Sequence, residues 1–164
     1  MPSEQPLLLI NVVGLTPSLL GEATPQINAL LRTAKLAHLQ PVFPAVTSTV
    51  QASILTGAPP SQHGIVGNGW YFRDQAEVRF WLQPNALVQG EKVWHTLKRE
   101  FPAFRCSQLF WWYNMYADVD AAITPRPHYP ADGRKQFGLY SSPPGLHEQI
   151  EQQIGEFPFP GFWG

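Results

Sequence analysis

The chain has 164 residues, a formal net charge of −1 and only 14% charged side chains, against about 25% in an average soluble domain. This length supports one domain with its own hydrophobic core and is short for two. The Lys and Arg residues are scattered, which argues against a nucleic-acid polymer as partner. The low charge predicts an apolar face that meets another part of the protein or a second copy of the chain.

The start of the chain, MPSEQP, has no basic residue before its short apolar run, which disagrees with a secretory signal. No apolar stretch reaches the length of a membrane span. The single cysteine, Cys106, cannot form an internal disulfide, and we interpret it as a buried, unreactive thiol. These features predict a cytoplasmic protein that does not contact a membrane.

The first forty residues have the pattern of a βαβ unit. The continuous aliphatic run Leu7–Leu15 predicts a buried parallel strand followed by a turn. Thr24-Pro25 opens a helix with proline at its first position, and Lys35–Phe43 returns as a second strand. The predicted fold class is therefore α/β, with a mostly parallel sheet flanked by helices. In such sheets the functional groups gather at the carboxyl ends of the strands.

A hydroxyl side chain follows the second predicted strand. Thr47 comes after a proline-containing turn and directly before a predicted helix, Ser48–Leu55, which ends at Thr56-Gly57. Unpaired N–H groups and the positive end of the helix dipole converge at such a place, which favours an anion. A threonine before a helix is also a common N-cap, so capping is the alternative for Thr47.

The rest of the chain alternates short strands and helices. Two short strands joined by a four-residue turn predict a small antiparallel hairpin near Thr47. A later helix is expected to bury Val93, Trp94 and Leu97, and the final helix is polar enough to face solvent on at least one side. The expected ranges are strands 69–73 and 78–82, helix 91–100, strands 105–110 and 120–124, and helix 146–154.

Aromatic residues are concentrated between the last two predicted strands. Trp111, Trp112, Tyr113 and Tyr116 could stack on a base or a sugar, and Arg126 could meet a phosphate. Burial in the core beneath a long loop is the alternative, and for most of the Trp residues we prefer it.

The run Pro125–Lys135 is rich in proline and turn residues, which predicts an irregular functional loop or docking surface. His128 is its candidate ligand residue. A lone histidine is more often a hydrogen-bonded surface residue, and that alternative stays open.

The stretch around Thr47 resembles the nucleophile region of the alkaline phosphatase superfamily, in particular the type I phosphodiesterase/nucleotide pyrophosphatase family and the phosphonoacetate hydrolases. The matching elements are Phe43-Pro44, Thr47, Thr56-Gly57, Pro59-Pro60 and the run HGIVGN at 63–68. The resemblance implies that Thr47 is the catalytic nucleophile and a metal ligand. It also implies that Asn68 is a catalytic amide that donates to a phosphoryl oxygen. A turn residue with positive φ is the alternative for Asn68, and His63 is interpreted as structural.

The same resemblance implies a two-metal site, with zinc the expected cation, and a small-molecule phosphodiester, nucleotide or phosphonate as substrate. Val13 stands where the family normally has a metal-binding Asp, and an apolar side chain offers no lone pair. Asn11 faces the same side of the predicted strand but lies about 6–7 Å further back, so it is a poor replacement.

The resemblance covers the amino-terminal part of such an enzyme, because no cluster of Asp and His residues follows in this chain. Residues 1–164 are therefore predicted to form a single α/β domain that is the amino-terminal part of a larger phosphodiesterase domain. The expected function is metal-dependent phosphohydrolysis through a Thr nucleophile. The alternative is a non-catalytic relative that binds a phosphate ligand and has lost its metal ligands.

Overall fold

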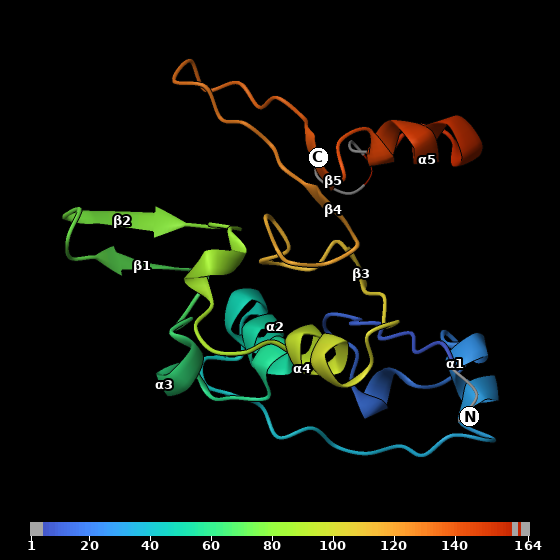
Figure 1. The fold of residues 1–164 in the computed structure, drawn as a ribbon. Helices are drawn as coiled ribbons and strands as arrows, with labels where there is room; N and C mark the ends of the chain where they lie inside the picture. Colours follow the sequence, from blue (N-terminus) through green and yellow to red (C-terminus); the bar gives the residue numbers. More distant parts are fainter. Residues whose placement is uncertain (1–4, 159–160, 162–164) are drawn as a thin grey trace. The chain divides into compact units, whose positions relative to one another are not determined.

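The fold is described by a computed structural model of residues 5–158 and 161 (Figure 1). The chain divides into two compact units, Met1–Gln40 and Pro41–Gly164. Part of the MPSEQP start lies outside the described residues. The site residues Thr47 and Asn68 both belong to the second unit.

The first unit contains a 3₁₀ helix, Pro17–Leu19, and helix α1, Pro25–Leu30. The prediction that a helix opens at Pro25 is confirmed. The predicted strands Leu7–Leu15 and Lys35–Phe43 are wrong: neither segment pairs with a strand within the described residues, and so no βαβ unit forms. A strand needs a neighbour for its N–H and C=O groups, and without one the apolar side chains stay open, with Leu7 90% exposed.

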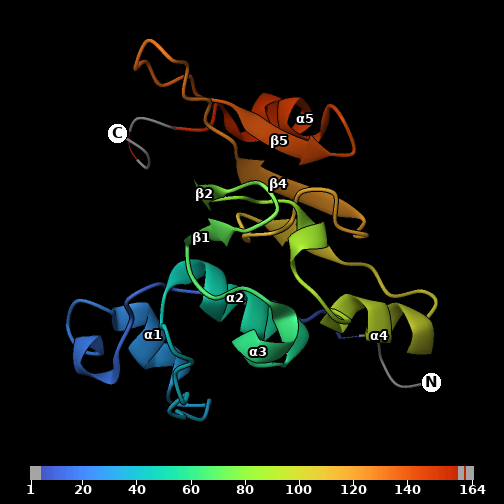
Figure 2. The same ribbon diagram turned by 90° about the vertical axis from the view of Figure 1, so that its left-hand side faces the viewer.

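Helix α2, Thr47–Thr56, opens the regular structure of the second unit. Gly57 ends the helix in the left-handed conformation, with φ of 64° and an N–H that donates to Ser53 O, because glycine adopts this conformation at little cost. The predicted helix is confirmed, with a start at Thr47 itself. The short helix α3, Pro60–His63, follows and packs against α2 (Figure 2).

The core of the second unit lies against α2. Its buried apolar members come from α2, from the segment after α3, from the stretch before α4 and from the aromatic segment. They are Ala52, Ile65, Val88, Trp112 and Tyr113, with Trp70 and Leu87 packed against them. The helix that begins at Thr47 is therefore held by the main apolar cluster. The preferred interpretation of Trp112 as a core residue is confirmed.

A two-stranded antiparallel hairpin begins one residue after Asn68. Its strands are β1, Gly69–Phe72, and β2, Glu77–Phe80. The hairpin is closed at its base by the N–H of Trp81, which donates to Asn68 O at 2.8 Å. The prediction of a small hairpin near Thr47 is confirmed.

The other sheet has three strands in the order β3-β4-β5, and β3 lies parallel to β4 while β5 is antiparallel to it. These strands are Ser107–Leu109, Ala121–Pro125 and Leu139–Ser142. Helix α5, Leu146–Ile154, packs on β4 and β5, as Figure 1 shows, and matches the predicted range. The chain is therefore a mixed α/β protein, and within the described residues the predicted mostly parallel sheet is not confirmed.

Helix α4, Val93–Glu100, confirms the predicted helix before β3. Trp94 is buried and Leu97 half-buried, but the prediction of an inward Val93 is wrong, because this side chain is 52% exposed. One residue step turns the side chain by about 100° on a helix, so Val93 points away from the face on which Trp94 is buried, as predicted for Trp94. Within the described residues, no helix is long and apolar enough to cross a membrane.

The segment between β4 and β5, which the structure describes throughout, contains no helix or strand, as the sequence predicts, but its two halves are paired at two places. The N–H of Arg126 donates to Gly138 O at 2.7 Å, and His128 and Gln136 exchange two backbone hydrogen bonds of 2.8 Å. The two strands thus continue outward as a paired arm with its turn at Gly133. The prolines do not prevent this pairing, because Pro127 lies between the two paired positions Arg126 and His128.

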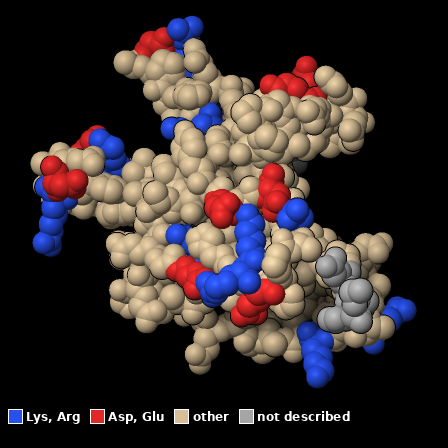
Figure 3. Space-filling view, in the orientation of Figure 1, with Lys and Arg blue, Asp and Glu red and all other residues tan. Residues whose placement is uncertain are grey.

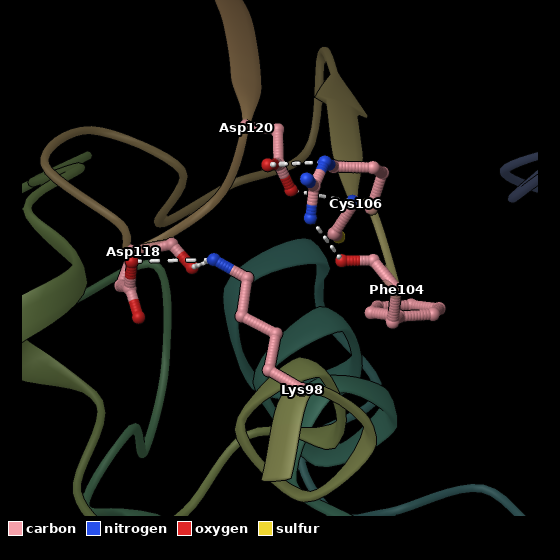
Figure 4. Close-up of polar contacts among 6 residues, drawn as sticks. Lys98, Phe104, Cys106, Asp118 and Asp120 are labelled. Carbon is pink, nitrogen blue, oxygen red and sulfur yellow. Dashed lines mark hydrogen bonds and ion pairs between the residues drawn. The ribbon is translucent and has the colours of Figure 1, made fainter. Parts of the chain in front are cut away.

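An ion pair connects α4 to the segment that precedes β4 (Figure 4). Lys98 Nζ donates to Asp118 at 3.0 Å to its carbonyl and 3.3 Å to its carboxylate. The N–H of Cys106 donates to Asp120 Oδ2 at 2.8 Å and lowers the pKa of that carboxyl. On the face shown in Figure 3, basic and acidic side chains lie among one another.

The predicted buried, unreactive thiol is partly confirmed. Cys106 is half-buried rather than buried. Burial still raises the pKa of its thiol, which reduces the thiolate that would react.

Replacement of Gly69 by alanine is expected to destabilise the protein by about 1–3 kcal/mol. A Cβ at this position would lie 2.3 Å from Phe80 Cδ1 and 2.8 Å from the backbone oxygen of Arg79. The backbone contact cannot relax without moving β2. Urea unfolding measures the change, with Gly21→Ala as control because a Cβ there meets nothing within 4 Å. Equal midpoints for both variants would contradict the expectation.

Candidate active site

Thr47 is the first residue of α2, and its side chain is half-buried. The N-cap position is held by Val46, which has no hydrogen-bonding side chain. Capping by Thr47, the alternative raised by the sequence, is therefore not what the structure shows. No hydrogen bond involves Thr47 Oγ1 within the described part of the chain, and so the hydroxyl is available to a ligand.

Asn68 is brought to the first turn of α2 from twenty residues further along the chain. Its Oδ1 accepts a hydrogen bond of 3.0 Å from the N–H of Ser48, the residue next to Thr47. Because an N–H can donate only to the carboxamide oxygen, this bond also fixes which end of the amide is the NH₂ group. The structure does not give Asn68 the positive φ of the alternative turn reading. The Asn68 carboxamide thus lies at the first turn of α2, and its NH₂ group remains to donate to another partner.

The first turn of α2 favours an anion. It carries no acidic side chain, and its N-cap does not satisfy the N–H groups that start the helix. Within the described residues the N–H groups of Thr47 and Thr49 have no acceptor, while that of Ser48 is taken by Asn68. Unpaired N–H groups and the helix dipole together stabilise negative charge at this place.

Two further hydroxyls lie in the same turn. Thr49 Oγ1 is buried and has no hydrogen-bond partner within the described residues, and the buried Ser48 Oγ has the Tyr113 hydroxyl as its one polar neighbour among them. Because side chains on a helix tilt toward its N-terminus, these hydroxyls lie toward the start of α2. A buried hydroxyl without a hydrogen-bond partner lowers the stability of the folded chain. The first turn of α2 therefore concentrates unused polar groups.

The aromatic segment reaches α2 through Gln51, which sequence reasoning missed. Gln51 is buried, and its Oε1 accepts a hydrogen bond of 2.7 Å from the N–H of Trp112. Burial raises the pKa of Tyr113 to about 12, and the neighbouring Ser48 hydroxyl opposes that shift in part. The one signal in the sequence was a long polar side chain one helical turn after Thr47, on a face otherwise occupied by small and apolar residues.

His63, interpreted from sequence as structural, is fully buried behind α2. Its Nδ1 accepts from the N–H of Ile65 at 3.1 Å, and so in the neutral ring Nε2 carries the proton and faces Ser53 Oγ at 2.9 Å. Both ring nitrogens are thus used by the protein. Burial lowers the pKa of His63, with a backbone hydrogen bond opposing the shift.

The lowered pKa of His63 predicts that stability falls as the pH decreases. The unfolded chain takes up a proton near the ordinary value of 6.5, whereas the folded chain does so only at lower pH. The contribution of His63 is therefore complete above pH 6.5 and is lost as the pH falls toward the folded pKa. Urea unfolding at several pH values between 7.5 and 5, each at about 25 °C, measures this change in the free energy of unfolding. The same pH dependence in His63→Gln would contradict the assignment to His63.

The aromatic and basic side chains that the sequence offers as ligand residues lie in different environments. Trp112 and Tyr113 are buried in the core, whereas Tyr116 is 74% exposed. Arg126 and His128 lie exposed on the arm between β4 and β5. The structure thus does not gather the predicted aromatic and basic side chains into one ligand site.

The described residues do not fit a metal centre. No group of three or more His, Cys, Asp or Glu side chains that could hold a metal ion occurs among them. Val13 is 75% exposed and lies in a turn of the first unit, where the N–H of Leu15 donates to Val12 O at 3.3 Å. Asn11 is also outside any strand, so the strand geometry used to relate it to Val13 does not hold. The donor set that the resemblance implies is thus absent from the described part of this chain.

The arrangement combines a free hydroxyl, unpaired N–H groups and an oriented carboxamide within one helical turn. Such a set can hold a tetrahedral anion and present an oxygen nucleophile to it. Comparison with curated proteins and with solved structures gave no significant match. The family model described as type I phosphodiesterase / nucleotide pyrophosphatase matches residues 7–160, which includes every residue of this turn, and the chain therefore belongs to that family.

Proposed function

We propose that this protein hydrolyses small-molecule phosphodiesters or nucleotide pyrophosphates through Thr47. The family suggests this class of substrate. The observation that carries the proposal is the 3.0 Å hydrogen bond from the N–H of Ser48 to Asn68 Oδ1, which holds the carboxamide at the first turn of α2 and leaves its NH₂ group to donate to a ligand. A phosphoryl group at the start of α2 would meet this donor and the unpaired N–H groups together.

In the proposed reaction Thr47 Oγ1 forms a bond to phosphorus, the ester oxygen opposite to it leaves, and the hydroxyl proton passes to solvent. Asn68 Nδ2 and the N–H groups of Thr47 and Thr49 hold the equatorial oxygens, whose charge grows in the transition state. Water then cleaves the threonine ester and restores the hydroxyl. The described residues thus position the attacking hydroxyl and stabilise the negative charge on the phosphoryl oxygens.

Divalent cations, with zinc the expected metal, remain part of the proposal on the basis of the family resemblance. The described residues supply no such ligand set. Metal-dependent hydrolysis would therefore require ligands beyond those that the structure describes, with Thr47 as the hydroxyl that this chain adds.

We propose that the chain is the amino-terminal part of a larger domain of the alkaline phosphatase type. The apolar start of the first unit supports this, because an aliphatic run is normally covered. Leu7, Leu8 and Ile10 are 90%, 80% and 68% exposed. A second copy of the chain is the other partner that could cover this run.

A non-catalytic function is the second candidate. The absence of a metal-binding group among the described residues, with Val13 in place of the expected Asp, favours a protein that binds a phosphate ligand and does not turn it over. Such a protein would use the same turn of α2 and the same Asn68 donor. The two candidates differ in whether the Thr47 hydroxyl attacks.

Hydrolysis of bis(p-nitrophenyl) phosphate and measurement of bound zinc distinguish them. Both are measured on this chain and on any longer product of the same gene, with and without added zinc and with EDTA. Turnover that requires zinc supports the hydrolase. Binding of inorganic phosphate without turnover in any of these forms favours the binding protein.

A further inference from the structure

The aromatic segment Phe110–Tyr116 carries unusual backbone conformations. Phe110, Tyr113 and Tyr116 have φ angles of 61°, 63° and 60°. Large L side chains rarely adopt this left-handed region, because their Cβ crowds the backbone. Three such residues within seven positions persist only where surrounding contacts hold them, and such strain clusters at functional sites.

Side-chain hydrogen bonds to backbone groups hold this segment. Gln51 Oε1 accepts from the N–H of Trp112 at 2.7 Å. From the other side, Asn85 Nδ2 donates to Tyr113 O at 2.8 Å, and the backbone N–H of Asn85 donates to Met115 O at 2.8 Å. Gln51 and Asn85 are both buried, so neither bond competes freely with water.

Gln51 is also the member of this set that lies on α2. It follows Thr47 by four residues, which places both on the same face of the helix, one turn apart. Next to it, Ala52 is fully buried in the cluster that contains Trp112 and Tyr113. The apolar packing of Ala52 against Trp112 and Tyr113 and the hydrogen bond from the N–H of Trp112 to Gln51 thus hold the strained segment against the first two turns of α2.

We propose that Gln51 is a positioning residue of the Thr47 site. By holding Trp112 and Tyr113 against α2, it keeps the first turn in the register in which Ser48 is bonded to Asn68. This inference rests on the proposed function for its catalytic consequence, but the order of the first turn is measurable without any substrate.

The matched variants are Gln51→Met and Gln51→Glu. Methionine has nearly the same length and removes the acceptor, so the N–H of Trp112 is left buried and unpaired. Glutamate keeps an oxygen in the position of Oε1 that accepts the same bond, and it adds a negative charge that methionine does not carry. The comparison therefore isolates the hydrogen bond from the volume of the side chain.

Hydrogen exchange at the Ser48 amide reports the first turn, and the Ile150 amide within α5 serves as control. We expect exchange at Ser48 to be about tenfold faster in Gln51→Met, unchanged at Ile150, and largely restored in Gln51→Glu. Unchanged exchange at Ser48, or equal acceleration at both amides, would overturn the proposal, since the latter means only a loss of global stability.

The rate of phosphodiester hydrolysis is the second measurement that tests the role of Gln51. If the unsubstituted chain hydrolyses bis(p-nitrophenyl) phosphate, Gln51→Met should lower kcat about tenfold and change KM less than about twofold. An unchanged kcat with faster exchange at Ser48 would overturn the positioning role. If neither this chain nor a longer product of the same gene shows turnover, the proposed hydrolysis fails, whereas the exchange result still decides whether Gln51 orders the turn.

Discussion

Replacement of Thr47 by alanine is expected to reduce phosphodiester hydrolysis to the background rate while the chain remains folded. The hydroxyl is the attacking atom in the proposed reaction, and loss of a nucleophile costs on the order of 10⁴-fold or more. The fold should survive because Thr47 Oγ1 takes part in no hydrogen bond within the described residues and Val46 holds the N-cap position. Release of p-nitrophenol from a phosphodiester measures the rate, and circular dichroism checks the fold.

Thr47→Ser is the control for this experiment. Serine keeps the oxygen and loses only the methyl group, so part of the activity should remain. Undiminished hydrolysis in Thr47→Ala would remove Thr47 from the reaction.

Replacement of Asn68 by alanine is expected to lower kcat by about 10²-fold, the usual effect of losing one donor to a developing charge. The variant also leaves the N–H of Ser48 without its 3.0 Å partner, so the first turn of α2 becomes less ordered. Steady-state kinetics with bis(p-nitrophenyl) phosphate measures the change.

Asn68→Asp separates the two roles of this side chain. Aspartate keeps an acceptor for the N–H of Ser48 but has no NH₂ group and adds a negative charge. We expect hydrogen exchange at Ser48 to stay near that of the unsubstituted chain while kcat falls at least as far as in Asn68→Ala. Unchanged kcat in both variants would make Asn68 a structural residue of the turn.

The local patterns of the second unit predicted its structure well. Thr47 to Gly57 combines a helix-compatible run with a glycine that ends it, and both features act within a few residues. The hairpin after Asn68 and helix α5 are likewise decided by short-range pattern. The resemblance then led to Thr47 and Asn68, which the structure brings to one turn of α2 through the bond to Ser48.

The errors concern features that depend on distant partners. The run Leu7–Leu15 has the composition of a buried strand, but a strand also needs a neighbour, and the described residues provide none. The pairing within the segment between β4 and β5 was also missed, because a run rich in proline gives no signal for the bridge between His128 and Gln136. Gln51 was overlooked because its partner, the N–H of Trp112, lies 61 residues away.

The most direct test of Thr47 as nucleophile is to trap its covalent intermediate. The protein, in the form that turns over, is mixed with bis(p-nitrophenyl) phosphate, quenched in acid within the first turnover, and mapped by mass spectrometry. We expect a phosphoryl adduct on Thr47 that still bears one nitrophenyl ester and is absent from Thr47→Ala. An adduct on another residue, or one that persists in Thr47→Ala, would contradict it.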